Sequence, residues 1–327
     1  MHAASEIHDF AISKQHGVKI VVVGSINMDL VYHVSRLPKP GETLTGTSFH
    51  QIHGGKGANQ AVAAARMGAD VSMIGRVGDD AFGASLIEGL QRESIDVSHV
   101  KISPATSSGL AVIGVDANGQ NCIAVIPGAN GQVIPTDIES AESIIAAANV
   151  LLVQLEIPVD AVITAINIAR RHNVQIILDP APAAESWSAE LLNVHIVCPN
   201  ETEASFFTGL PVGNIAEASA ACLKLRSLGA SIAIITMGGQ GCVVCDESGV
   251  PVHVPAVPVT AVDTTAAGDA FAGALGFCLA QRRTIQEAVQ FASAAGALAA
   301  TRHGAQPAMP RFDEVTLQEY YGRGVPN

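Results

Sequence analysis

The part of the chain after residue 136 alternates short apolar runs with longer segments of helical periodicity, and this alternation constrains the fold most. It predicts helices at about 137–147, 159–172, 215–228, 267–281 and 284–301. It predicts strands at about 150–154, 175–179, 195–198, 232–236 and 241–246. Strands that alternate with helices form a parallel sheet covered by helices on both faces. The predicted fold class is therefore α/β, with a mostly parallel central sheet.

Two stretches without helical periodicity interrupt this pattern in the first half of the chain. Residues 27–52 contain a Pro-Lys-Pro-Gly turn at 38–41 and have the pattern of a β-ribbon. Residues 107–127 contain two strands, 109–115 and 121–126, around an Asn-Gly turn typical of hairpins. We expect both stretches to form one small β-sheet beside the main domain, as a lid over the site. Around them, the α/β pattern continues with strands at 19–24 and 71–77 and helices at 58–67 and 82–93.

Composition and charge narrow the possible partners. Of the 327 residues, 48% are hydrophobic and only 4% aromatic, which suits Ala-rich helices on Val- and Ile-rich strands. The net charge of −12 argues against nucleic acid or an anionic membrane surface as a partner. It does not argue against ATP, because local amides and one or two cations bind phosphates. No apolar run reaches the roughly 18 residues that a membrane span requires.

Six cysteines, most of them in apolar runs, predict buried free thiols. Cys242 and Cys245 stand three residues apart in a predicted strand, so they should point to opposite faces and share no metal or redox site. Unpaired thiols suit a reducing compartment, and we expect a cytoplasmic protein. Residues 1–17 lack the features of a signal peptide and are expected to be a disordered leader. We expect the main domain over 18–312 and a C-terminal tail over 313–327.

The segment Asp263-Thr-Thr-Ala-Ala-Gly-Asp269 leads small residues into a predicted helix. A helix start offers unpaired amides and the positive end of the dipole to an anion, and Ala266, Ala267 and Gly268 leave the backbone accessible. A transferring phosphoryl group needs such a site. Asp269 lies in the same turn, where an ionised carboxylate can accept a proton from a hydroxyl group. The alternative is that Asp269 only caps the helix.

The run His53-Gly-Gly-Lys-Gly-Ala-Asn-Gln60 also leads into a predicted helix, although it lacks the spacing of a P-loop. Gly54 and Gly55 permit close backbone approach, and Lys56 and Asn59 provide donors for hydroxyl groups. The alternative is a Gly-rich helix start with a surface lysine.

Polar residues also follow the first predicted strand, in Gly24-Ser-Ile-Asn-Met-Asp29. Asn27 and Asp29 share a face of an extended chain, and ligands of open α/β sheets bind at the carboxyl ends of strands. This pair suits a polyol, and the alternative is an ordinary Asx turn.

Three further segments follow predicted strands. In Cys198-Pro-Asn-Glu-Thr-Glu203, two carboxylates and an amide suit hydrated Mg²⁺, held through water and phosphate. The alternative is that Asn200 or Thr202 caps the next helix. The Gly-rich turn 236–241 either lines a nucleotide or closes a hairpin, and Gln154-Leu-Glu156 ends one strand with a carboxylate.

In this order, the runs Gly54–Gln60, Gln154–Glu156, Asn200–Glu203 and Asp263–Asp269 resemble the ribokinase-like carbohydrate kinases, which form the phosphofructokinase B family. The resemblance covers about residues 19–310. It implies a Rossmann-like central domain and a β-lid that also joins two copies as a homodimer. It implies an ATP- and Mg²⁺-dependent enzyme that phosphorylates D-ribose at O5.

Matching positions imply a role for individual residues. The implied base is Asp269, with Gly268 and Ala267 in the anion hole. The implied sugar-binding residues are Asn27, Asp29, Gly54, Gly55, Lys56, Asn59, Glu156 and Asp269. The implied nucleotide-binding residues are Asn200, Thr236, Met237, Gly238, Gly239, Gln240, Gly241, Gly268 and Ser293, and Glu203 acts on Mg²⁺. The resemblance also implies a K⁺ site at Asp263, Thr265, Ala299, Arg302, Gly304 and Ala308. The family commonly has Gly where this chain has Ala266, a departure that leaves activity intact.

Alternatives of other kinds stay open. A kinase for 2-deoxyribose or another pentose would share these motifs, although Asn27 and Asp29 favour the reading of a 2-hydroxyl group. A nucleoside kinase is disfavoured because only Tyr32 and Phe49 provide rings near the sugar-binding runs. An inactive sugar-binding regulator is opposed by the intact Asp269. A nicotinamide dehydrogenase lacks its GxGxxG fingerprint here.

Overall fold

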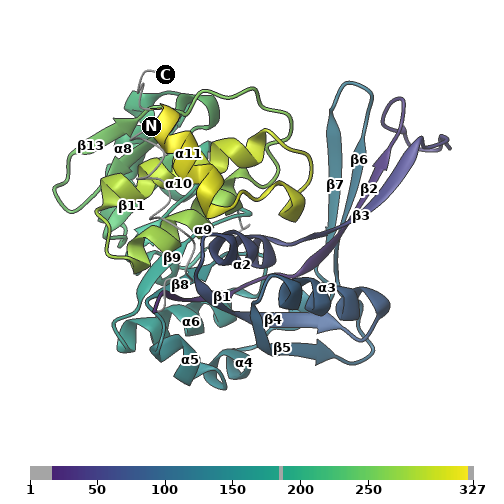
Figure 1. The fold of residues 1–327 in the computed structure, drawn as a ribbon, viewed down its shortest axis with the longest axis horizontal. Helices are drawn as coiled ribbons and strands as arrows, with labels where there is room; N and C mark the ends of the chain where they lie inside the picture. The colour runs from purple at the N-terminus through teal and green to yellow at the C-terminus, as the bar shows by residue number, and fades with distance from the viewer. Residues whose placement is uncertain (1–16, 184–186, 323–327) are drawn as a thin grey trace, which may run out of the picture.

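The centre of the fold is a nine-stranded sheet (Figure 1), with the strand order β13-β12-β11-β10-β9-β8-β1-β4-β5. The computed structural model describes residues 17–183 and 187–322, so nearly all of the expected leader lies outside the described residues. The strands are β1 (Lys19–Val23), β4 (Asp70–Gly78), β5 (Asp96–Ser103), β8 (Val150–Val153), β9 (Gln175–Leu178), β10 (Ile196–Val197), β11 (Ile232–Thr236), β12 (Cys242–Cys245) and β13 (Pro251–Val254). Strand β12 runs antiparallel to both of its neighbours, and the other pairings are parallel. This arrangement confirms the predicted mostly parallel sheet.

Helices cover both faces of this sheet because its strands are apolar on both sides. In β1, Ile20 and Val22 pack with one set of helices, and Val21 and Val23 pack with the other. The first set is α2 (Lys56–Arg66), α3 (Ala81–Arg92), α9 (Ala267–Ala280), α10 (Ile285–Ala300) and α11 (Phe312–Gly322). The second set is α4 (Pro135–Glu139), α5 (Glu142–Ala146), α6 (Val159–Arg171), α7 (Glu201–Thr208) and α8 (Ile215–Ser227). No described helix is long and apolar enough to cross a membrane.

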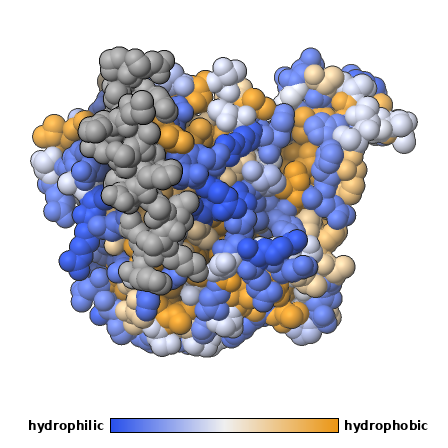
Figure 2. All heavy atoms as spheres, in the orientation of Figure 1, coloured by the Kyte–Doolittle hydropathy of each residue, from blue (hydrophilic) through white to orange (hydrophobic). Residues whose placement is uncertain are grey.

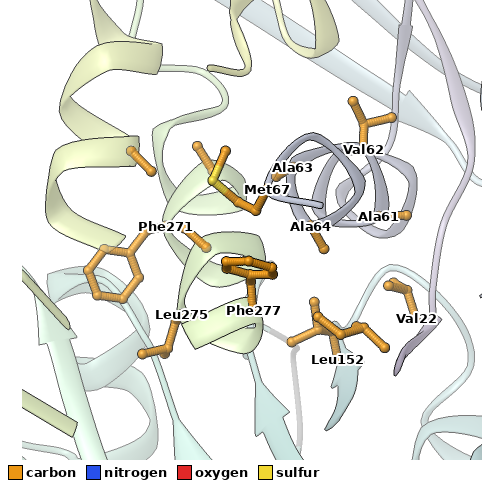
Figure 3. Packing of buried hydrophobic residues seen from close by; sticks show 14 of the residues in the cluster. Val22, Ala61, Val62, Ala63, Ala64, Met67, Leu152, Phe271, Leu275 and Phe277 are labelled. Atoms are coloured by element: carbon orange, nitrogen blue, oxygen red, sulfur yellow. The ribbon is translucent and has the colours of Figure 1, made fainter. Parts of the chain in front are cut away.

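Helices α2 and α9 pack tightly against each other on the first face. Figure 3 shows Ala64 of α2, and Met67 just after this helix, beside Phe277 of α9 in one apolar cluster. A Cβ at Gly273 of α9 would lie 2.5 Å from Ala63 Cβ and 2.9 Å from two backbone atoms of α2. The glycine therefore lets the two helix backbones approach closely. As a result, the first turn of α2 lies beside the first turn of α9.

A second, smaller sheet of four strands stands beside the main body (Figure 1) in the order β3-β2-β6-β7. Its strands are β2 (Asn27–His33), β3 (Ser48–Gly54), β6 (Gly109–Val115) and β7 (Asn121–Ile126). Strand β2 pairs in parallel with β6, which joins the predicted ribbon and the predicted hairpin into one sheet as expected. Apolar side chains gather along these strands (Figure 2), and exposed ones include Phe49, Ile123 and Val125.

Several elements differ from expectation. The helix expected at 137–147 is two short helices, α4 and α5. The edge strands β5 and β13 were not predicted, because their exposed residues follow no apolar pattern. The segment expected as a tail from residue 313 begins with helix α11. This helix packs through Phe312, whose ring centroid lies 5.8 Å from that of Phe277 and 5.7 Å from that of Phe291.

The six cysteines are free thiols, and five of them are buried. Cys242 packs on one face of the main sheet and Cys245 on the other, as expected for residues three apart in a strand. Among the residues that the structure describes, no group of three or more His, Cys, Asp and Glu is arranged to hold a metal.

Candidate active site

Most of the buried polar side chains gather where the central strands end. Ser25 follows β1, Gln154 follows β8 and Asp179 follows β9. Because parallel strands end at the same edge of a sheet, residues far apart in sequence meet there. The gathered side chains are Ser25, Asn27, Asp29, Asn59, Gln60, Asn130, Gln154, Asp179, Glu203 and Asp269.

The carboxylate of Asp269 is held in the first turn of α9 and is only 3% exposed. Its Oδ2 accepts a hydrogen bond from Asn59 Nδ2 at 2.9 Å, and its Oδ1 accepts one from Gln60 Nε2 at 3.2 Å. Burial raises the pKa of Asp269 to about 6, while the Lys56 ammonium opposes this rise. At neutral pH the group is therefore ionised, with a pKa close enough to the working pH for it to accept a proton.

The amino end of α9 is open to an anion. No side chain of a described residue caps it, and a Cβ at Gly268 would meet no described atom within 4 Å. The amide of Ala267, which we expected in the anion hole, donates instead to Thr264 O at 3.2 Å. The amides of Gly268 and Asp269 come next in the turn, where a helix has no acceptor of its own. These two amides and the helix dipole can stabilise a negatively charged group.

Lys56 begins helix α2 and faces several carboxylates. Its Nζ lies 3.7 Å from Asp179 Oδ2. Burial alone would lower the pKa of Lys56, but Asp179, Asp269, Glu156 and Glu203 together raise it well above its usual value. Lys56 is therefore a permanent cation among carboxylates and can also attract a phosphate or orient a hydroxyl group.

Asn27 and Asp29 lie on β2 and are both buried. Asp29 packs so tightly against Gly54 that a Cβ there would lie 2.2 Å from Asp29 Oδ2. Gly55 has a φ of 88°, and a Cβ there would lie 2.6 Å from Asn27 N. The Gly-Gly pair thus lets α2 begin directly beside β2. Burial raises the pKa of Asp29 to about 7, with Glu156 and Asp269 adding to the rise.

Glu156 ties three segments of the site together. Its Oε2 accepts hydrogen bonds from Ser25 Oγ at 2.5 Å and from Lys56 N at 3.2 Å. Glu156 therefore fixes the start of α2 against the segment that follows β1.

The residues predicted to meet the nucleotide lie together on neighbouring strands. Asn200 forms a bridge with Thr236, at the start of the turn 236–241. Within that turn, a Cβ at Gly238 or Gly239 would meet no described atom within 4 Å. Ser293 of α10 lies near the Cys242 thiol at the start of β12. These predicted residues therefore border one region next to the end of β11.

Asn200 and Glu203 also form the capping box of α7. Glu203 N donates to Asn200 Oδ1, and Asn200 N donates to Glu203 Oε2, both at 2.9 Å. Burial raises the pKa of Glu203, although the Asn200 hydrogen bonds oppose the rise. Asn200 therefore does cap α7, as the alternative had it. The capping hydrogen bonds do not use Asn200 Nδ2 or Glu203 Oε1, so these two atoms can meet a ligand. Carboxylate and amide oxygens suit hydrated Mg²⁺, so Glu203 fits an ion held through water better than one in a protein cage.

The segment predicted to hold K⁺ is ordered around Asp263. Its carboxylate accepts hydrogen bonds from Thr265 N at 3.0 Å, Thr265 Oγ1 at 2.5 Å and Gly304 N at 2.9 Å. Burial alone would raise the pKa of Asp263, but these hydrogen bonds lower it overall. The Arg302 guanidinium turns to Glu314 of α11. The other two predicted positions lie on the last part of α10, at Ala299, and in the 3₁₀ turn Gln306–Ala308.

Five of the gathered side chains were given no role from sequence. They are Ser25, Gln60, Asn130, Gln154 and Asp179, and all are buried among the predicted residues. Gln60 Nε2 donates to Asp179 Oδ2 at 2.8 Å, so it bridges Asp179 and Asp269. Asp179 directly follows a predicted strand, and that position was the available signal for it.

The family model described as pfkB family carbohydrate kinase matches residues 18–311. The chain belongs to this family. The kinase is 39% identical to the ribokinase of Haemophilus influenzae over 90% of its own chain and 96% of that protein. It is 37% identical to the deoxyribokinase of Salmonella typhi, over 90% of its chain and 96% of that protein. Among solved structures, Arabidopsis thaliana ribokinase complexed with ribose and ATP is 31% identical and superposes with a TM-score of 0.85, over 93% of the kinase and 99% of that chain.

Proposed function

We propose that the chain is an ATP-dependent kinase that phosphorylates D-ribose at O5. One observation carries the proposal: the buried Asp269 carboxylate is fixed by Asn59 and Gln60 at the uncapped start of α9. This arrangement puts a proton acceptor beside an anion site, as phosphoryl transfer to a hydroxyl group requires. The sugar is proposed from the names of the similar ribokinases and from the Arabidopsis protein complexed with ribose and ATP.

In the proposed reaction, Asp269 accepts the proton of the attacking hydroxyl group. Asn59 and Gln60 each donate to one oxygen of this carboxylate, so they hold its orientation during the reaction. The Gly268 and Asp269 amides stabilise negative charge on the transferring group, together with the α9 dipole. The Lys56 ammonium lies near Asp269 and adds a positive charge that can also stabilise the transferring group.

Bound ATP would supply the phosphoryl group, and Mg²⁺ would neutralise charge on its phosphates. We assign the nucleotide to Asn200, to the turn Thr236–Gly241, to Gly268 and to the Ser293 region. Glu203 is the proposed residue for Mg²⁺, through water. The K⁺ ion is assigned to Asp263, Thr265, Ala299, Arg302, Gly304 and Ala308, several of them through backbone oxygens.

The small sheet is proposed to be both a lid and a dimer contact. Its outer strand β7 is exposed along its whole length, and exposed strand edges and apolar side chains favour a partner. We therefore propose a homodimer through the lid, with the kinase domain over 18–312. Cytoplasmic localisation is proposed from the free thiols.

A coupled assay of ADP formation across a panel of pentoses tests the function. We expect D-ribose to give the highest kcat/KM. A second candidate, a deoxyribokinase, is favoured by the 37% identity to the Salmonella typhi enzyme. A higher kcat/KM on 2-deoxyribose would select that candidate, and no turnover of any pentose would exclude both.

A further inference from the structure

Asn130 is a buried amide that the proposed mechanism does not use. It lies in the 3₁₀ turn Gly128–Gln132, just after lid strand β7, and is 1% exposed. Its Oδ1 accepts a hydrogen bond from Ile26 N at 2.9 Å. Its Nδ2 donates to Asn27 Oδ1 at 2.7 Å and to Ile26 O at 3.3 Å. Every polar atom of this side chain is therefore paired.

The contact with Ile26 fixes which way both amides point. A backbone N–H only donates, so the Asn130 atom that it meets must be the carbonyl oxygen. The other end of Asn130 is then the NH₂ group, which only donates. Asn27 must meet it with its own oxygen, so Asn27 Nδ2 is left as a donor. Among the described residues, Asn27 Oδ1 accepts the bond from Asn130, and Asn27 Nδ2 has no hydrogen-bond acceptor.

The fixed donor stands beside a fixed acceptor. Asp29 lies two residues further along β2, on the same face of the strand. A ligand hydroxyl group at this place is therefore met by a donor from Asn27 and by an acceptor from Asp29. A sugar that lacks the hydroxyl group leaves a buried N–H without a partner, and that loss is costly.

We propose that Asn130 is a specificity-determining positioning residue. By locking the Asn27 amide, it makes this site select sugars whose hydroxyl oxygen accepts a hydrogen bond there. The inference rests on the proposed pentose kinase function and extends it from the sugar-contacting residues to the residue that orients one of them. Asn130 also links the small sheet to the proposed sugar site, since it lies in the first turn after β7.

Asn130→Asp tests this inference, because it keeps the shape and the acceptor for Ile26 N but replaces the donor to Asn27. Asn27 then turns its NH₂ group toward residue 130 and presents an oxygen to the sugar. We expect the ratio of kcat/KM for ribose over 2-deoxyribose to fall by about tenfold or more, while KM for ATP changes little. Calorimetric binding of the two sugars without ATP should show the same loss of preference.

Gly109→Ala is a second variant, which disturbs the hydrogen bond between Asn130 and Asn27 without changing either residue. Its Cβ would lie 2.1 Å from Asn130 Nδ2 and 2.2 Å from Asn27 Oδ1, so the two amides must separate. It should lower the same ratio. Asn27→Ala removes the donor itself, and adding Asn130→Asp to it should lower the ratio no further. Asn214→Asp, at the cap of α8, makes the same change where Asp caps equally well and should leave the ratio unchanged.

The outcomes separate the inference from the proposed function. A folded Asn130→Asp variant that loses activity equally on both sugars, or keeps the wild-type ratio, overturns the role of Asn130. Wild-type protein that neither binds nor phosphorylates ribose overturns the proposed function, and the inference with it.

Discussion

The ammonium of Lys56 lies 3.7 Å from the carboxylate of Asp179, at the point where the start of α2 meets the end of β9. This pair sets the charge balance of the site, because one lysine faces four carboxylates. Burial raises the pKa values of the buried acids Asp29, Asp179 and Asp269, and the excess of negative charge adds to the rise. The excess of negative charge also favours the binding of cations, such as those that accompany a nucleotide in the proposed reaction.

Replacement of the proposed base should separate binding from chemistry. Asp269→Asn keeps the shape of the side chain but cannot accept the proton of a hydroxyl group. We expect kcat to fall about 10²–10⁴-fold, with ribose binding by calorimetry largely kept. Asp160→Asn, an exposed change on α6, is the matched control. Turnover at the wild-type rate in Asp269→Asn would remove Asp269 from the reaction.

The pH dependence of kcat/KM should reflect the protonation of the buried carboxylates. The pKa of Asp269 is raised to about 6 and that of Asp29 to about 7, so kcat/KM should fall as pH drops through the range between them. The coupled groups titrate together and give apparent values. Asp179→Asn removes a negative charge that raises the pKa of Asp269, so its acid limb should move to lower pH. A limb that stays in place or moves to higher pH contradicts this coupling.

The open space at the start of α9 predicts the effect of one added methyl group. Gly268→Ala should fold normally, because its Cβ would meet no described atom within 4 Å. The methyl group would enter the space proposed for the transferring phosphate, so KM for ATP should rise or kcat should fall by about tenfold or more. Gly213→Ala, before α8, is the control, with 3.5 Å to its nearest described atom. Equal kinetics for both variants would place the phosphate elsewhere.

Much of the fold could be predicted because it depends on local patterns. Apolar runs of strand length and helical periodicity located the strands of the parallel sheet, and the Asn-Gly turn located the hairpin. The edge strands β5 and β13 were missed because their residues are mostly exposed or half-buried and form no continuous apolar run. The direction of β12 depends on a short turn, and the sequence pattern is the same for either direction.

The site could be predicted only in part, for a similar reason. Residues in runs of unusual composition, such as Lys56 and Asp269, stand out locally. Asn130 lies in a Gly-Ala-Asn-Gly segment that has the pattern of an ordinary turn. Its role arises because β2 pairs with β6 and β6 pairs with β7, and together these pairings bring the distant Asn130 beside Asn27. Such long-range pairing leaves no signal near the residue itself.

The proposed K⁺ site predicts dependence on a monovalent cation. When K⁺ is replaced by tetramethylammonium, we expect kcat to fall, since a bulky ion cannot enter the Asp263–Gly304 segment. Asp263→Asn loses the acceptor for Gly304 N and should raise the K⁺ concentration needed for half-maximal rate. A rate that is the same in both cations would remove K⁺ from the reaction.

The proposed homodimer through the small sheet should dissociate when a charged residue is introduced on β7. Val125 on β7 is exposed, and Val125→Glu should place like charges in the contact between two lids. Sedimentation should give a dimer for the wild type and a monomer for the variant. Leu223→Glu, at an exposed apolar position on α8, is the control and should stay dimeric. A wild-type monomer at all concentrations would exclude the contact.

Gly273 limits how this kinase can change over evolutionary time. Any larger residue there would push α9 away from α2, and with it Asp269 away from Asn59 and Gln60. A substitution at Gly273 is therefore expected to reduce turnover, even though the residue contacts no substrate in the proposed reaction. Changes at Asn27 and Asp29 of the small sheet, in contrast, would alter the proposed sugar contacts without separating the two helices.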